Sequence, residues 1–118
     1  MELSIQRVDR AIVLTLNGQL TISTADQYNR ELARALEPAK KDGVFVLQIG
    51  HTSHLTSSGI KCLFETERRC VDEGIVFGIV CESEGVTSVL ELTGIPNYIP
   101  VRKTLTELHS HFRFHGKT

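Results

Sequence analysis

The sequence predicts an α/β fold, with a mixed sheet of about five strands and about four helices. The first observation is that strand-like apolar segments alternate with helical patterns along the chain. The second is that two runs, Val44–Ile49 and Ile75–Val80, are apolar at nearly every position. Strands buried on both faces are typical of the interior of a sheet. We therefore expect both runs to be buried strands, with Val44–Ile49 at the centre.

The first half of the chain predicts two strands, a helix and the central strand. Leu3–Ile5 indicates a short first strand and Ile12–Leu16 a second, and Asp9–Arg10 joins them as a hairpin. Thr24–Gln27 has the pattern of a capping box and predicts the start of a helix. Its apolar face consists of Tyr28, Leu32, Ala35 and Leu36. Pro38 is expected to end or kink this helix.

The second half repeats the alternation. A helix is expected from the Ser-Ser-Gly triple at Ser57 to about Asp72, and a short one around Val86–Leu90. Gly94 fits the left-handed position that ends this short helix, and Pro96 stops it. Tyr98–Val101 then predicts an edge strand, because its proline cannot donate to a neighbouring strand.

The last element is a helix that begins with a second capping box, Thr104–Glu107. Leu108 and Phe112 continue its apolar face. From Arg113 onward the chain is polar. We therefore expect a single domain over residues 1–118, with a core of about 3–112 and a frayed tail of 113–118.

Composition excludes several classes of function. The formal net charge is −1 and no basic stripe is present, which argues against nucleic acid as a ligand. No run of about 18 apolar residues predicts a membrane span. The first six residues lack the basic and apolar regions of a signal peptide. Cys62, Cys70 and Cys81 have no C-x-x-C spacing and are expected to be reduced, partly buried thiols of a cytoplasmic protein.

The turn from strand to helix at His54–Ile60 is the most informative segment. Two serines and a glycine open a helix after a buried strand. Ligands and partners of open α/β sheets gather at the carboxyl ends of the strands. A phosphate at this point meets free backbone N–H groups and the positive end of the helix dipole.

Three stretches of the chain stand out as motifs. They are Gly18–Thr21 followed by Thr24-Ala25, the Ser-Ser-Gly segment Leu55–Ile60, and Val89–Ile95 with its Leu-Thr-Gly. They resemble, in order, the Gly-Glu-Leu-Asp segment with its Thr-Ala pair, the apolar-Asp-Ser-Ser-Gly-Leu signature and the closing Leu-Thr-Gly helix of the STAS family. That family contains the bacterial anti-sigma factor antagonists and the cytoplasmic domains of sulfate transporters. The resemblance covers about Leu3 to Phe112, with the three stretches in order at matching spacing.

The resemblance implies a binding protein of the antagonist type and no enzyme activity. Ser58 matches the serine that a partner anti-sigma kinase phosphorylates, with Ser57 and Thr56 as the neighbouring alternatives. The unmodified antagonist binds the anti-sigma factor, and the phosphorylated form does not. The implied partner-binding surface comprises Thr21, Thr24, Thr56, Ser57, Ser58, Gly59, Lys61 and Glu65. No cofactor, metal or small-molecule substrate is implied.

This chain departs from the family at four of these positions. Thr21 and Thr56 stand where antagonists commonly carry aspartates, and Lys61 and Glu65 replace small residues of the signature helix. These changes alter the charge of the surface that faces the partner. They indicate either a specialised or divergent partner or the loss of phosphorylation.

Other interpretations of the same residues stay open. Ser57 and Ser58 can be an N-cap and a first-turn residue, which stabilise a helix by about 1 kcal/mol. His51 and His54 lack an evident third metal ligand, and no Gly-x-Ser-x-Gly elbow supports a catalytic serine. The alternatives in function are a non-phosphorylated STAS subunit of a larger assembly, such as the stressosome or the partner of a lipid-transport ATPase, and a small nucleotide- or lipid-binding module.

Overall fold

The computed structural model describes residues 1–51 and 53–112 of the chain. Its main sheet has five strands in the order β1-β2-β4-β6-β7. The strands are β1 (Glu2–Val8), β2 (Ala11–Asn17), β4 (Val44–Ile49), β6 (Val76–Cys81) and β7 (Val101–Arg102). β1 is antiparallel to β2, and every other neighbouring pair is parallel. The predicted mixed sheet, with Val44–Ile49 at its centre, is confirmed.

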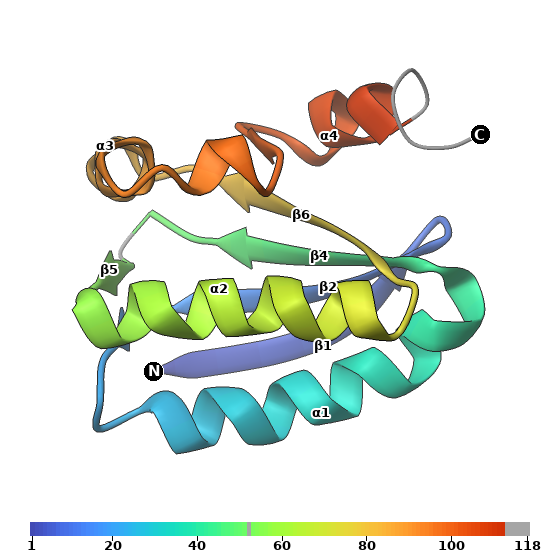
Figure 1. The fold of residues 1–118 in the computed structure, drawn as a ribbon, viewed down its shortest axis with the longest axis horizontal. Coiled ribbons are helices and arrows are strands. Elements are labelled where there is room, and N and C mark those ends of the chain that lie inside the picture. Colours follow the sequence, from blue (N-terminus) through green and yellow to red (C-terminus); the bar gives the residue numbers. More distant parts are fainter. Residues whose placement is uncertain (52, 113–118) are drawn as a thin grey trace.

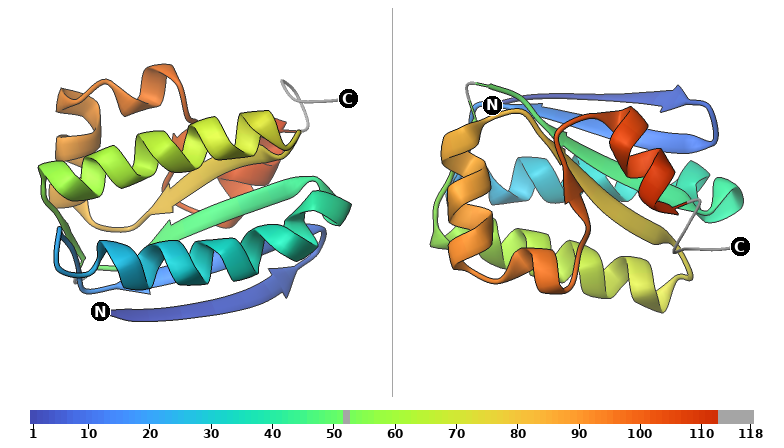
Figure 2. Two further views of the ribbon diagram at one scale, coloured as in Figure 1. Left: turned by 60° about the horizontal axis from the view of Figure 1, so that its bottom comes forward. Right: turned by 90° about the horizontal axis from the view of Figure 1, so that it is seen from above.

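Four α-helices cover the sheet (Figure 1). They are α1 (Ala25–Asp42), α2 (Ser57–Asp72), α3 (Glu84–Leu92) and α4 (Leu105–His111), and a 3₁₀ turn, η1 (Ile95–Asn97), follows α3. Figure 2 shows α1 and α2 side by side on one face of the sheet and α4 on the other. α3 lies at the end where the parallel strands finish.

The alternation of side chains along the strands explains this layering. On β2, Leu14 and Leu16 point into the larger core beneath α1 and α2, whereas Val13 belongs to the smaller core beneath α4. In the smaller core, Leu108 of α4 packs directly on Gly78 of β6. A Cβ atom at Gly78 would lie 2.8 Å from the nearest Leu108 carbons, so the missing side chain allows α4 its close approach.

Of the two predicted effects of Pro38, to end or to kink the first helix, the structure contradicts the ending. α1 continues for another turn to Asp42 and ends at Gly43, which has the left-handed φ of 88°. A proline in a helix removes one backbone N–H donor. Ala35, Leu36 and Ala39 are nevertheless all buried around it. The buried face on both sides of the proline therefore holds the last turn against the sheet.

The predicted strand Tyr98–Val101 is also shorter in the structure. Only Val101 and Arg102 pair with β6, and a 3₁₀ turn at residues 95–97 precedes them. Gly94 has the predicted left-handed conformation, and the carbonyl of the buried Ile95 accepts hydrogen bonds from the N–H groups of Tyr98 and Ile99. Because these two N–H groups are used in the turn and Pro100 has none, pairing with β6 begins only at Val101.

A buried hydroxyl pair joins α1 to α2. The oxygens of Tyr28 and Thr66 lie 2.7 Å apart, and the Thr66 hydroxyl donates to the carbonyl of Cys62, also at 2.7 Å. Because Thr66 has a single hydroxyl proton, Tyr28 must donate to Thr66. Burial keeps the pKa of the Tyr28 phenol well above its usual value.

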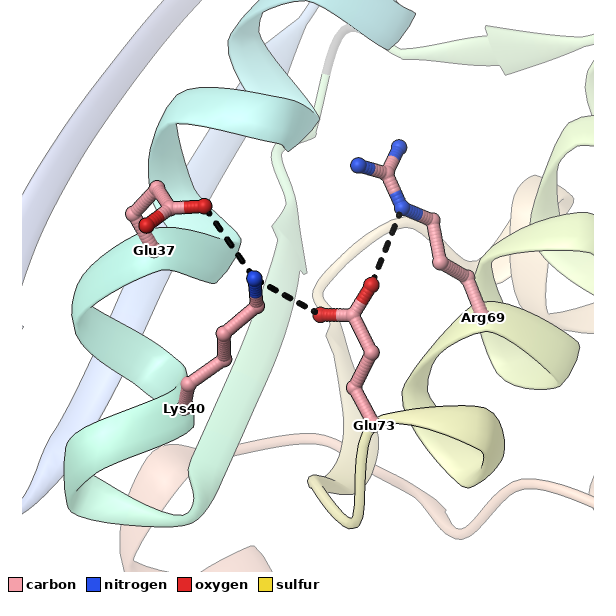
Figure 3. Close-up of polar contacts among 4 residues, drawn as sticks. All are labelled: Glu37, Lys40, Arg69 and Glu73. Atoms are coloured by element: carbon pink, nitrogen blue, oxygen red, sulfur yellow. Dashed lines mark hydrogen bonds and ion pairs between the residues drawn. The ribbon is translucent and has the colours of Figure 1, made fainter.

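Near their C-terminal ends the same helices are joined by charges. Lys40 of α1 contacts Glu37 at 3.2 Å and Glu73 at 3.7 Å, and Glu73 also contacts Arg69 of α2 at 3.6 Å (Figure 3). The hydrogen bond from Lys40 to Glu37 raises the pKa of the Lys40 ammonium. Exposed pairs of this kind contribute little individually. The network therefore aligns the helix ends more than it stabilises the fold.

The short parallel pair of β3 (Gln19–Leu20) and β5 (His54–Leu55) determines where α2 begins. Gly59, in the first turn of α2, lies against the carbonyl oxygen of Leu20. A Cβ atom at Gly59 would be only 2.5 Å from that oxygen. Backbone atoms cannot move aside as a flexible side chain does, so α2 reaches β3 only with glycine here.

We expect Thr66→Val to destabilise the protein more than Tyr28→Phe. The phenylalanine variant removes a donor and leaves Thr66 bonded to Cys62, at a cost of about 1 kcal/mol. The valine variant leaves the buried phenol without its acceptor, at a cost of about 1–3 kcal/mol. Urea unfolding measures both values. The double variant should cost less than the sum of the two, and additive costs would contradict the direct hydrogen bond.

Gly59→Ala should destabilise the protein by about 1–3 kcal/mol, the usual cost of overpacking. The matched control is Gly85→Ala in the first turn of α3, where the nearest atom to a new Cβ is the Ser83 hydroxyl at 3.8 Å. Alanine there is expected to change stability by less than about 1 kcal/mol, in the stabilising direction. Equal effects of the two substitutions in urea unfolding would show that Leu20 does not restrict Gly59.

Candidate functional site at the start of α2

Two segments that are far apart in the sequence meet at one end of the sheet. β3 and β5 pair Gln19 with His54 and Leu20 with Leu55. The N–H of His54 donates to the carbonyl of Gly18 at 3.0 Å, and the N–H of Thr56 donates to that of Leu20 at 3.3 Å. The segments Gly18–Thr24 and Leu55–Ile60 therefore form one continuous surface beside the N-terminus of α2 (Figure 1).

Thr56 is the N-cap of α2. Its hydroxyl accepts a hydrogen bond from the Gly59 N–H at 3.4 Å and donates one to the Leu20 carbonyl at 3.2 Å. A threonine can do both because a hydroxyl is donor and acceptor at once, whereas an aspartate carboxylate only accepts. The hydroxyl of Thr56 is thus engaged in joining α2 to β3.

Ser57 and Ser58 are the first two residues of α2. Neither side chain makes a hydrogen bond to any other described residue. Ser57 is exposed and Ser58 is partly buried. Since Thr56 caps the helix, neither serine hydroxyl is used for that purpose, and both are available for other chemistry.

The hydroxyls of Thr21 and Thr24 hold the neighbouring loop together. Thr24 accepts from the N–H of Thr21 at 2.9 Å and donates to the carbonyl of Gln19 at 2.8 Å. Thr24 is the N-cap position of α1 but makes no side-chain cap bond, so the predicted capping box with Gln27 was wrong. The Thr24 hydroxyl bonds to the backbone of the loop instead, and the Gln27 side-chain amide donates to the carbonyl of Met1.

Lys61 and Glu65 lie on the exposed side of α2, one and two turns after Ser57. Together with Ser57 they line a surface hollow of about 420 Å³. The other lining residues are Ile60, Phe64 and Arg68. Of the predicted surface residues, the structure therefore places Ser57, Lys61 and Glu65 around one hollow, with Thr21 and Thr24 in the adjoining loop.

Residues that suggested other chemistry are occupied elsewhere or buried. His51 contacts Glu82 at 3.5 Å, and the described residues contain no group of three potential metal ligands. All three cysteines are buried and free. Burial raises the pKa of Cys62 and raises that of Cys70 to about 12, so both thiols are protonated at neutral pH and are weak nucleophiles.

Three exposed apolar side chains at this end of the molecule were missed by the sequence analysis. Ile22, in the loop between β3 and α1, is 80% exposed, and Leu92 at the end of α3 is 87% exposed. Tyr98 is exposed after η1 and contacts Phe64 of α2 edge to face, with ring centroids 5.9 Å apart. For Ile22 the available signal was an apolar residue inside an otherwise polar turn, which a periodic pattern does not register.

None of the helices among residues 1–51 and 53–112 is long and apolar enough to cross a membrane. Among curated proteins, no match to the chain is found. Comparison with solved structures gives clear matches to anti-sigma factor antagonists, and all of those described below share less than 25% sequence identity with the chain.

The chain is similar to an anti-sigma factor antagonist from Mycobacterium paratuberculosis, with a TM-score of 0.80, 20% identity, and coverage of 95% of this chain and 93% of that one. It is also similar to a putative antagonist from Thermotoga maritima, with a TM-score of 0.76, 18% identity, and coverage of 94% of each chain. For the antagonist SpoIIAA in its unphosphorylated form, the TM-score is 0.69 and the identity 16%, with coverage of 98% of this chain and 100% of that one. At this level of identity, these similarities show a common fold.

The family model of the STAS domain matches residues 2–108, which is nearly the whole chain. The match spans the five-stranded sheet, the paired segments at the start of α2 and most of α4. The fold and the matched sequence agree, and the chain therefore belongs to the STAS domain family.

Proposed function

We propose that this STAS domain binds an anti-sigma factor or serine kinase through the surface at the start of α2, and that phosphorylation of Ser58 switches this binding. The supporting observation is that the segments Gly18–Thr24 and Leu55–Ile60 converge around two serines whose hydroxyls have no partner among the described residues. The protein itself supplies a surface and an acceptor hydroxyl. The partner kinase supplies the chemistry.

A phosphate on Ser58 is compatible with the fold. It adds about −1.5 to −2 charges at neutral pH, at a helix N-terminus that stabilises negative charge by roughly 0.3–1 kcal/mol. Because Thr56 caps the helix, modification of Ser58 removes no cap bond. The same charge must be desolvated when a partner docks, which opposes binding.

A second hollow, beside α3, is acidic and therefore a poor site for a nucleotide. This hollow, of about 610 Å³, lies between His51, α3 and the residues after β7. Its charged lining includes Glu82, Glu84 and Glu91 as well as Lys103. Three carboxylates repel a phosphate group, so a nucleotide is disfavoured there.

The partial burial of Ser58 favours one alternative, a STAS subunit that is not phosphorylated. A kinase must extract or reach a partly buried hydroxyl, and Ser57 beside it is more exposed. Whether Ser58 is phosphorylated in the cell therefore distinguishes a switched antagonist from a constitutive subunit of a larger assembly.

Thr56→Asp restores the aspartate that antagonists commonly carry before the two serines. We expect it to keep the fold but lower the thermal midpoint by about 4–8 °C, equivalent to about 1 kcal/mol in a domain of this size. The carboxylate can still cap Gly59 but cannot donate to the Leu20 carbonyl. Thr56→Ser, which retains both bonds, should change the midpoint less. A higher midpoint for the aspartate would show that the helix dipole outweighs the Leu20 bond.

The proposed switch is tested with protein purified from its native host. Intact-mass and phosphosite analysis should find one phosphate on Ser58 that is absent from Ser58→Ala. Ser57→Ala should retain it, and so should Ser88→Ala, which removes an exposed serine of α3. Undiminished phosphorylation of Ser58→Ala, or a chain that is never modified, would refute the assignment.

Binding provides the second measurement. Titration calorimetry against the co-purifying kinase or anti-sigma factor should give at least tenfold weaker affinity for the phosphorylated form than for the unmodified one. Ser58→Ala should bind like unmodified protein, and Ser58→Asp should show an intermediate affinity because aspartate carries less charge than phosphate. Equal affinities would leave a binding domain without a phosphoswitch.

A further inference from the structure

The exposed side of α2 carries an aromatic side chain between two cations. Lys61, Phe64 and Arg68 follow one another at spacings of three and four residues, so they share one side of the helix. All three line the hollow of about 420 Å³, whose remaining lining residues are Ser57, Ile60 and Glu65. Tyr98 contacts Phe64 edge to face and extends the apolar surface to η1.

Both cations are available to a partner. Neither Lys61 nor Arg68 has an ion-pair partner among the described residues. Other basic side chains of the two large helices, such as Arg34, Lys40 and Arg69, contact carboxylates. Glu65 is the one acidic residue lining the hollow, so the lining carries a net positive charge.

The spacing defines the partner's geometry. Arg68 follows Lys61 by seven positions of the helix, which corresponds to a rise of about 10 Å with Phe64 near the middle. A helix alongside α2 presents matching groups when an apolar residue lies between two carboxylates at positions i, i+3 and i+7. The apolar side chain then meets Phe64 and Tyr98, and the carboxylates meet the two cations.

We propose that this hollow is the docking surface for an acidic amphipathic helix of a partner protein. The inference rests on the proposed function because it takes the α2 surface as the surface that binds the partner, and it adds the chemistry of that partner. It extends the surface beyond the predicted residues to Phe64, Arg68 and Tyr98. Ser57 lines the same hollow, and Ser58 follows it in the first turn of α2 without lining the hollow. A phosphate on either serine adds negative charge at this end of the hollow and repels the partner's carboxylates.

Two synthetic alanine-based helical peptides of 18 residues test the docking surface. One carries two overlapping Glu-x-x-Leu-x-x-x-Glu repeats, and the other has lysine in place of each glutamate. Titration into ¹⁵N-labelled full-length protein should shift the backbone amides of Ile60–Arg68 and Tyr98 with the acidic peptide. The lysine peptide should bind at least tenfold more weakly, and added salt should weaken the acidic complex.

Lys61→Glu combined with Arg68→Glu should weaken binding of the acidic peptide at least tenfold. The matched control is Arg30→Glu combined with Lys41→Glu, which makes the same change in net charge at exposed positions of α1. The control should retain binding within about twofold, as expected of charges outside the contact. Tyr98→Ala, at an exposed position, should cost several-fold without unfolding the protein.

The proposal is overturned if the acidic peptide does not bind, if the lysine peptide binds equally well, or if the control variant weakens binding as much as the Lys61/Arg68 variant. These results do not depend on phosphorylation. A mapped phosphate on Ser58 with no peptide binding would refute this docking surface alone. Peptide binding by a chain that is never phosphorylated would refute the proposed switch alone.

Discussion

The carbonyl oxygen of Leu20 is the point on which the arrangement of the candidate site depends. It accepts hydrogen bonds from both the N–H and the hydroxyl of Thr56, at 3.3 and 3.2 Å. It also lies so close to Gly59 that no side chain fits between them. One backbone atom of β3 thereby determines where α2 begins, which residue caps it, and why its third residue is glycine.

At this junction the hydroxyls of the two serines differ in hydrogen bonding from those of the threonines around them. Thr21, Thr24 and Thr56 each use their hydroxyls to close a turn or cap a helix. Ser57 and Ser58 have no such bonds among the described residues. Hydroxyls that stabilise the structure and hydroxyls that remain available therefore lie close together at this site. A modification at the serines can change the charge of the surface without releasing the structure beneath it.

The remainder of the fold supplies a rigid support for that surface. Both faces of the central strand β4 are buried, one beneath α1 and α2 and the other beneath α4. The Tyr28–Thr66 bond and the network of Lys40, Glu73 and Arg69 hold α1 against α2 along their length (Figure 3). Because α2 is packed on its inner side, its outer residues Lys61, Phe64 and Arg68 keep a defined spacing.

The sequence by itself determined the fold class and the central position of Val44–Ile49, and it indicated the candidate site at Leu55–Ile60. These follow from local signals, since apolar periodicity and the Ser-Ser-Gly triple act within a few residues. The tertiary structure decided which hydroxyls cap, because Thr24 faces Gln19 and Thr56 faces Leu20 only after β3 pairs with β5. It also carried α1 past Pro38, where burial of Ala39 outweighs local preference. It delayed the last strand to Val101, because the N–H groups of Tyr98 and Ile99 donate to the Ile95 carbonyl. The hollow lined by Lys61, Phe64 and Arg68, and the contact of Phe64 with Tyr98, likewise required the packed chain, because α2 and the residues after η1 come together only in the folded protein.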